Sequence, residues 1–164
     1  MDTGMKDRVA VITGGSSGIG LAVAAAFLRE DAKVAICGRD RRRLDDAAAH
    51  LAEMSDPTRV LSRSCDVRDE GEVEGLRDAV VAAFGGCDVL ILNAGEARQS
   101  DFYDTSDQDW RDEFELKFFS VLRPVRAFLP MLEESGQGAI VCTSALIARR
   151  PEPFLIATGA ARAG

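Results

Sequence analysis

Short apolar runs alternate with longer amphipathic stretches along this chain, and the alternation restricts its fold more than any other feature. Four of the five runs are rich in Val and Ile, which is typical of parallel strands buried on both faces. The third run is more polar, as expected of a strand at the edge of a sheet. The predicted strands are residues 8–13, 33–37, 59–64, 88–92 and 138–143.

Helical spacing of apolar residues fills the segments between these strands. Amphipathic patterns cover residues 18–30, 41–54 and 73–84, and a longer one covers 106–134 with an expected kink or break at Pro124 and Pro130. Such an order predicts an α/β fold, a doubly wound parallel sheet with right-handed crossovers and helices on both faces. Ligands of these sheets bind at the carboxyl ends of the strands, where the strand order reverses.

A glycine-rich loop follows the first predicted strand and leads directly into a helix. It reads Thr13-Gly14-Gly15-Ser16-Ser17-Gly18-Ile19-Gly20. Glycines let a backbone approach a phosphate closely, and a helix N-terminus offers unpaired N–H groups to it. The alternative is a plain Gly/Ser turn between a strand and a helix. The position after the first strand favours a nucleotide site.

The loop has the spacing TGxxxGxG, and from here on the sequence resembles the short-chain dehydrogenase/reductase family. Further matches follow later strands: Asp66-Val67, Asn93-Ala94-Gly95, and Ser144 at the place of the family's substrate-polarising serine. Taken singly, each has another explanation, because Asp66 can cap a turn, Asn93 can bond neighbouring backbone and Ser144 can end a strand. The resemblance implies a Rossmann-like fold and a cofactor site formed by Thr13, Gly14, Ser16, Ser17, Gly18, Ile19, Gly20, Asp66, Val67, Asn93, Ala94 and Gly95.

The end of the second predicted strand indicates which nicotinamide cofactor binds. NAD-dependent proteins place a carboxylate there for the ribose 2′-hydroxyl, whereas a 2′-phosphate requires Arg. This chain has Gly38 and then Arg39. We expect Arg39 to bind the phosphate and NADP(H) to be preferred over NAD(H). Arg42 and Arg43 are interpreted as a solvated helix face balanced by nearby Asp residues.

The resemblance fails at the residues that normally carry the chemistry. The family's YxxxK pair, whose Tyr is the general acid/base, corresponds here to Ala157 and Ala161. The sole tyrosine, Tyr103, has Asp107 rather than Lys four residues later. A methyl group exchanges no proton, so the usual mechanism cannot run unchanged.

Lys117 stands where the family has an asparagine of its proton relay, inside the apolar stretch FELKFF. A partly buried lysine has a lowered pKa and serves as an acid, a base or an electrostatic clamp. The alternative is a lysine that reaches solvent or pairs with Glu113 or Glu115. Our hypothesis is that Lys117 and Ser144 are the catalytic residues, with Arg162 as another cation near the lost lysine position.

The chain stops where the family's domain continues, which predicts a C-terminally incomplete sheet with an open fifth strand. Residues 1–164 are interpreted as a single NADP-binding domain, the N-terminal part of a family domain. A fragment of a longer chain explains the length better than a partner that supplies the cover. Three functions stay open: an NADP(H)-dependent oxidoreductase interconverting a carbonyl and an alcohol with atypical acid/base residues, a catalytically silent nucleotide-binding protein, and a truncated product without function.

The amino-acid composition excludes some classes of binding partner. Lys and Arg number 20 against 27 Asp and Glu, a formal net charge of -7, which argues against nucleic acid or an anionic membrane. No stretch is apolar enough to span a membrane or to form a signal peptide. Scattered cysteines without a CxxC pair indicate no metal and a reduced, cytoplasmic setting. The fourth predicted helix is a candidate homo-oligomer surface or core element through Phe114, Phe118, Leu122 and Phe128.

Overall fold

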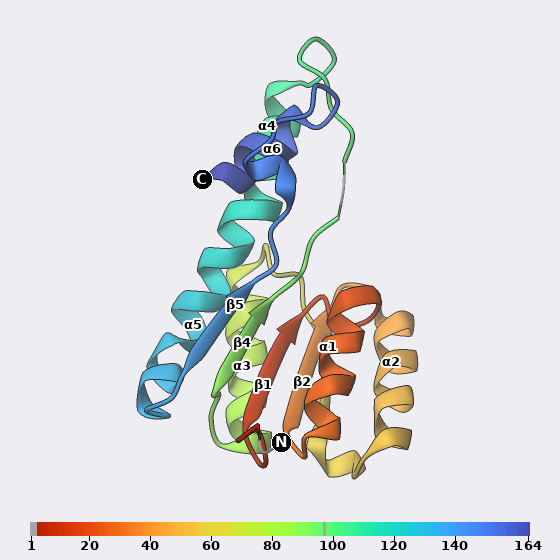
Figure 1. Cartoon of the computed structure of the whole chain (residues 1–164), viewed down its shortest axis with the longest axis vertical. Coiled ribbons are helices and arrows are strands. Elements are labelled where there is room, and N and C mark those ends of the chain that lie inside the picture. Colours follow the sequence, from red (N-terminus) through yellow and green to blue (C-terminus); the bar gives the residue numbers. More distant parts are fainter. Residues whose placement is uncertain (1–2, 97) are drawn as a thin grey trace.

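Five parallel strands form one sheet in a computed structural model that describes residues 3–96 and 98–164 (Figure 1). The strands are β1 (Val9–Thr13), β2 (Lys33–Gly38), β3 (Val60–Ser64), β4 (Val89–Leu92) and β5 (Ala139–Cys142). Their order across the sheet is β3-β2-β1-β4-β5, so β1 pairs with both β2 and β4. The predicted Rossmann-like architecture is confirmed, and the order reverses at β1, beside β4. The polar third run is an edge strand, as its composition predicts.

Helices cover both faces of the sheet and form two separate cores. The helices are α1 (Gly18–Arg29), α2 (Arg41–Met54), α3 (Glu70–Phe84), α4 (Asp107–Phe114), α5 (Ser120–Glu134) and α6 (Ile156–Ala163). One core joins α1 and α2 to the sheet through residues such as Leu28 and Leu44. The other joins α3 and α5 through residues such as Leu76 and Phe128. Phe128 is fully buried, so it belongs to this core and not to an open surface.

Polar side chains at the helix starts and a glycine at one helix end fix several helix boundaries. Asp40 accepts a hydrogen bond from the Arg43 N–H at the start of α2, and Asp69 accepts one from Glu72 at the start of α3. Ser106 and Asp109 form a reciprocal capping box at the start of α4. Gly85 ends α3 in the left-handed conformation. These local signals fix where α2, α3 and α4 begin and where α3 ends.

The predicted helix over residues 106–134 is interrupted, but not where the prolines stand. Regular α-helix ends at Phe114, a π-helical turn covers Glu115–Phe119, and α5 then runs through both Pro124 and Pro130. The expectation of a break at the prolines is therefore wrong. Pro124 has no N–H for the carbonyl four residues earlier, and the irregular turn ends directly before that carbonyl's residue, Ser120.

Strand β5 is exposed along its whole length, in contrast to β1 and β4, which are buried throughout. Among the strands that the structure describes, β5 stands at the end of the sheet and pairs with β4. Cys142 on this strand is exposed, while Cys37, Cys65 and Cys87 are buried, and all four are free thiols. Within the described ranges, no helix is both long and apolar enough to cross a membrane.

Candidate functional site

A cleft of about 880 Å³ opens at the carboxyl ends of the strands, beside the switch point between β1 and β4. Its walls come from the loops that follow β1, β2, β3 and β4, together with Leu116, Thr143 and Arg162. Eleven of the residues predicted to bind a cofactor line it: Gly14, Ser16, Ser17, Gly18, Ile19, Arg39, Asp66, Val67, Asn93, Ala94 and Gly95.

The glycine loop is shaped by positions that have no room for a side chain. Gly14 has φ +67°, and a Cβ there would lie 2.9 Å from the Ala94 Cα. A Cβ on Gly20 would collide with the Gly14 carbonyl oxygen. Gly18 also has a positive φ, and no atom stands within 4 Å of where its Cβ would be. The loop therefore presents bare backbone and the first turn of α1 to the cleft, which is the arrangement that suits a phosphate.

Thr13 and Asn93 tie this loop to β4. The Thr13 hydroxyl accepts hydrogen bonds from the N–H groups of Asn93 and Ala94, both at 3.0 Å. The Asn93 side-chain amide donates to the Thr13 and Gly14 carbonyls at 3.3 Å. Thr13 is buried and, like Gly20, does not line the cleft. Thr13 and Gly20 are therefore the predicted cofactor residues that shape the cleft wall from behind without lining it.

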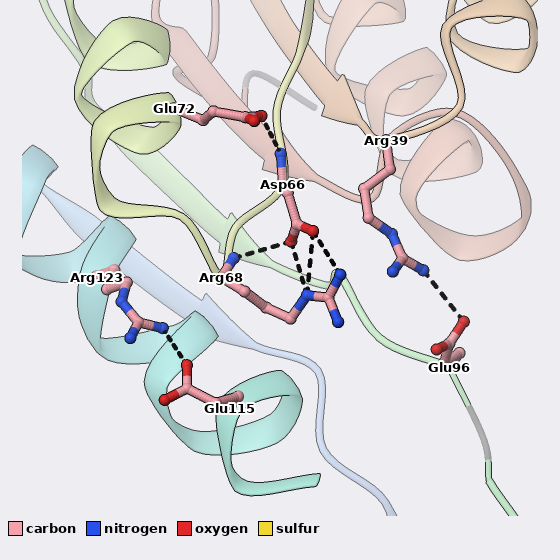
Figure 2. A network of polar contacts seen from close by, with 7 residues as sticks. All are labelled: Arg39, Asp66, Arg68, Glu72, Glu96, Glu115 and Arg123. Carbon is pink, nitrogen blue, oxygen red and sulfur yellow. Dashed lines mark hydrogen bonds and ion pairs between the residues drawn. The ribbon is translucent and has the colours of Figure 1, made fainter. Parts of the chain in front are cut away.

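Arg39 reaches across one end of the cleft to Glu96. Figure 2 shows this contact, in which the Arg39 Nη2 lies 3.2 Å from the Glu96 Oε2. The two side chains are 48% and 59% exposed. Residue 38 is a glycine, so no carboxylate side chain projects there, and a Cβ at this position would lie 3.1 Å from the Ser16 Oγ. Arg43 lines the cleft as well, although its side chain is largely exposed and pairs with Asp40. The exposure of Arg43 and its pairing with Asp40 agree with its interpretation as part of a solvated helix face, and this face also borders the cleft.

Asp66 follows β3 and is held by its neighbour Arg68. The carboxylate accepts hydrogen bonds from the backbone N–H and from the guanidinium of Arg68 (Figure 2). This contact with Arg68 lowers the pKa of Asp66. The Asp66 N–H donates to Glu72 at 2.7 Å. Asp66 thus caps its own turn and lines the cleft at the same time. A capping role and a cofactor-binding role for Asp66 are therefore compatible.

Lys117 lies in the π-helical turn with its side chain only 1% exposed. Its Nζ donates to the Glu96 carbonyl at 2.5 Å and lies 3.5 Å from the Glu113 Oε2. Burial lowers the pKa of Lys117, and Glu113 partly opposes that effect. The pairing with Glu113 that the sequence allowed is present, whereas a side chain extended into solvent is not. Lys117 itself stands directly behind the cleft wall that Glu96 and Leu116 form.

The segment after β5 brings a different set of groups to the site. Thr143 lines the cleft, whereas Ser144 is exposed and does not. Arg162 lines the cleft and donates to the Thr143 carbonyl at 3.2 Å. Ala157 and Ala161, at the positions of the family's Tyr and Lys, are fully buried. Among the residues of this segment, Arg162 therefore brings a positive charge to the cleft wall.

A second, smaller cavity of about 270 Å³ lies beside Glu113, the ion-pair partner of Lys117. Glu113 and Ala157 line it, together with Arg98 and Asp109, which form an ion pair. Sequence reasoning named Glu113 only as a partner for Lys117. Its burial could be suspected from its position four residues before Lys117, on the same side of a helix. Its contact with α6 could not, because α6 is distant in the sequence.

Metal-binding chemistry has no support in the residues that the structure describes. Across residues 3–96 and 98–164, no group of three or more His, Cys, Asp or Glu side chains is arranged to hold a metal ion.

A parallel doubly wound sheet with a bare-backbone loop at its switch point defines the class of Rossmann-like nucleotide-binding folds. The particular family follows from sequence comparison. The family model described as short chain dehydrogenase matches residues 8–164, and the chain belongs to this family.

Similar proteins include oxidoreductases of known structure. A Pseudomonas aeruginosa short-chain oxidoreductase, solved with NADPH bound and described as containing an atypical catalytic center, is 46% identical with a TM-score of 0.93, over 97% of this chain and 63% of that one. L-Sorbose reductase from Gluconobacter frateurii, solved with NADPH and L-sorbose, is 34% identical with a TM-score of 0.95, over 99% and 62%.

A curated relative is the 3α-hydroxysteroid dehydrogenase of Mediterraneibacter gnavus, 28% identical over 149 residues, which are 91% of this chain and 60% of that protein. The chain thus spans about three fifths of the length of such relatives.

Proposed function

We propose that this chain is the cofactor-binding part of an NADP(H)-dependent oxidoreductase that interconverts a carbonyl and an alcohol with atypical acid/base residues. The observation that carries the proposal is the cleft itself. Bare glycine backbone at Gly14 and Gly18 meets the N-terminus of α1 on one wall, and Arg39 stands at the end of β2. A pyrophosphate suits the first feature and a 2′-phosphate suits the second.

The preference for NADP(H) rests on charge at the end of β2. Gly38 leaves no carboxylate to bond a ribose 2′-hydroxyl or to repel a 2′-phosphate, and both Arg39 and Arg43 line this end of the cleft. Two of the similar proteins were solved with NADPH. These observations support NADP(H) over NAD(H).

When bound, the cofactor supplies the hydride, which becomes the new C–H bond of the alcohol. The two electrons of the carbonyl π bond then move to oxygen, and that oxygen needs a proton. We assign its donation to Lys117, whose ammonium is buried beside the cleft wall. We assign polarisation of the carbonyl to Ser144, which directly follows Thr143 on the cleft wall and would have to turn toward a bound substrate. Arg162, which lines the cleft, stabilises negative charge on the substrate oxygen or holds the cofactor's ribose.

A second candidate is a nucleotide-binding protein without turnover. Ala157 and Ala161 favour it, because both are buried methyl groups where the family has its proton-exchanging pair. Cofactor binding alone does not separate the two functions.

Under the first function, the substrate class is a small-molecule carbonyl or alcohol. The exposed side chains of Phe114 and Phe119, which precede α5, favour a second copy of the chain as a partner. The four free thiols suit a reduced, cytoplasmic setting.

NADPH oxidation against a panel of aldehydes, ketones and quinones tests the proposal. We expect turnover in the intact protein, and loss of turnover with retained NADPH binding in Lys117→Met. Lys33→Met is the matched control, because Lys33 lies at the start of β2 with its amine over the Phe84 ring, and it keeps full activity. Tight NADPH binding with no turnover on any acceptor selects the silent binding protein. Unchanged turnover in Lys117→Met removes Lys117 from the mechanism.

A further inference from the structure

Glu113 and Lys117 form a buried ion pair. Glu113 belongs to α4, which packs against α6 (Figure 1). The side chains of Glu113 and Lys117 are 3% and 1% exposed, and 3.5 Å separates the Lys117 Nζ from the Glu113 Oε2. The Thr158 hydroxyl, on α6, donates to the same Glu113 oxygen. The Lys117 ammonium also donates to the Glu96 carbonyl. Both charges are therefore held by a second partner.

Such a pair is costly to build, since the loss of hydration of two ions often exceeds their attraction. The other ion pairs of the described ranges all have partners at least a fifth exposed. Two apolar side chains of similar volume would fill the same space at no such cost. A buried charged pair beside a cleft is instead the pattern of a functional site.

The Glu113–Lys117 pair lies between the large cleft and the small cavity and contacts residues of both. Glu96, which accepts from Lys117, lines the large cleft. Glu113 lines the small cavity together with Ala157, the position where the family's tyrosine is replaced. Lys117 itself lies in the π-helical turn, and such turns within helices are frequent at functional sites. The pair thus spans the wall between the cofactor cleft and the space beside Ala157.

We propose that Glu113 is the positioning residue of Lys117. Its carboxylate holds the ammonium against the Glu96 carbonyl at the cleft wall and keeps it protonated, ready to give a proton to the substrate oxygen. The amine then regains a proton from solvent, with the Glu113 charge favouring its return. The inference rests on the proposed function, in which Lys117 is the proton donor.

The charges around Lys117 determine in which direction a substitution of Glu113 shifts the Lys117 pKa. Burial and Arg162 lower the pKa of Lys117, whereas Glu113 and Glu96 raise it. Arg98 lies across the small cavity from Glu113 but is paired with Asp109, and Thr158 carries no charge. Replacing Glu113 by glutamine therefore lowers the pKa of Lys117 further. Because carbonyl reduction needs the ammonium form, its rate then declines at a lower pH.

The direct readout is the titration of Lys117 by NMR of ¹³C-labelled lysine side chains. This chain contains only Lys6, Lys33 and Lys117, and the signal that Lys117→Met removes identifies the third. We expect Glu113→Gln to lower the Lys117 pKa by about one unit or more and to move the alkaline limb of NADPH oxidation, with the best acceptor of the panel, by a similar amount. Glu115→Gln is the matched control, because Glu115 pairs with Arg123 instead (Figure 2), and it leaves the Lys117 titration unchanged.

The outcomes separate the two claims. A Lys117 pKa that is the same in Glu113→Gln and in the unaltered protein overturns the inference, even where Lys117→Met abolishes turnover. An active Lys117→Met overturns the proposed role of Lys117 itself. If Glu113→Gln does not fold, Glu113→Asp decides, because the shorter side chain moves the carboxylate away from the Lys117 ammonium and should lower the Lys117 pKa in the same direction. A Lys117 pKa unchanged in Glu113→Asp contradicts the pairing.

Discussion

The carboxyl ends of β1 to β4 and the segment from β5 to α6 differ in how closely they keep the family's pattern. On the first side, the glycine loop, Asn93 and Asp66 combine into one lined cleft. On the second, Ser144 is exposed and outside the cleft, and Ala157 and Ala161 are buried methyl groups. The first region retains the features that suit a dinucleotide, while the second has lost the pair that exchanges protons.

This difference shows that holding a cofactor and exchanging a proton depend on separate parts of the fold. The dinucleotide cleft is made largely of backbone, which a parallel sheet positions at its switch point. Acid/base chemistry needs particular side chains, and a single substitution is enough to remove any one of them. We propose that the buried Glu113–Lys117 pair, on α4 and the π-helical turn, supplies part of that chemistry here.

The largest effect should come from filling the glycine loop. Gly14→Ala forces a side chain into a left-handed conformation and against the Ala94 backbone, so we expect NADPH affinity to fall by at least about 100-fold in a fluorescence titration. Gly85→Ala is the control, because Gly85 also has a positive φ but has open space around it at the end of α3. It should lower stability by about 1 kcal/mol and leave NADPH binding unchanged. Equal binding losses in both variants would mean that the loop acts only through general stability.

A smaller and more selective effect is expected at the end of β2. Arg39→Ala should weaken NADPH binding by about 10–100-fold, the range of a lost charge-assisted contact with phosphate, and change NADH binding little. Arg41→Ala provides the comparison, since Arg41 is exposed, pairs with Asp45 and does not line the cleft. Parallel losses for NADPH and NADH in Arg39→Ala would show that Arg39 does not select the phosphate.

The smallest predicted effect concerns the contact that Arg39 already makes. Glu96 competes with a phosphate for the Arg39 guanidinium, so Glu96→Gln should raise NADPH affinity by up to about fivefold, as expected for a half-exposed ion pair. Calorimetric titration with NADPH measures the gain, and NADH serves as the reference ligand. Weaker NADPH binding in this variant would mean that Glu96 supports the site instead of competing for it.

Much of the sheet could be predicted because its signals are local. Short apolar runs, four of them rich in Val and Ile, predicted each strand within one residue at either end. The more polar composition of residues 59–64 correctly indicated an edge strand. The prolines misled, because Pro124 and Pro130 fit inside α5 while the irregular turn forms just before it. A proline shows where a hydrogen bond is lost, but not how the neighbouring turns adjust.

The site was only partly predictable, for a related reason. The glycine loop is one continuous segment, so its sequence indicates its shape. The contacts of Glu113 with Thr158, and of Arg39 with Glu96, join residues 45 and 57 positions apart, and no local pattern announces them. The apolar neighbours of Lys117 allowed either a buried side chain or one that reaches solvent. Its burial and its carboxylate partner became definite only in three dimensions.

Isothermal titration of the intact protein with NADPH and with NADH tests the central claim most directly. The account predicts saturable binding of NADPH at a single site, at least about tenfold tighter than NADH, as expected of one charge-assisted contact with the 2′-phosphate. Absence of heat with either dinucleotide, or NADH bound as tightly as NADPH, would contradict it.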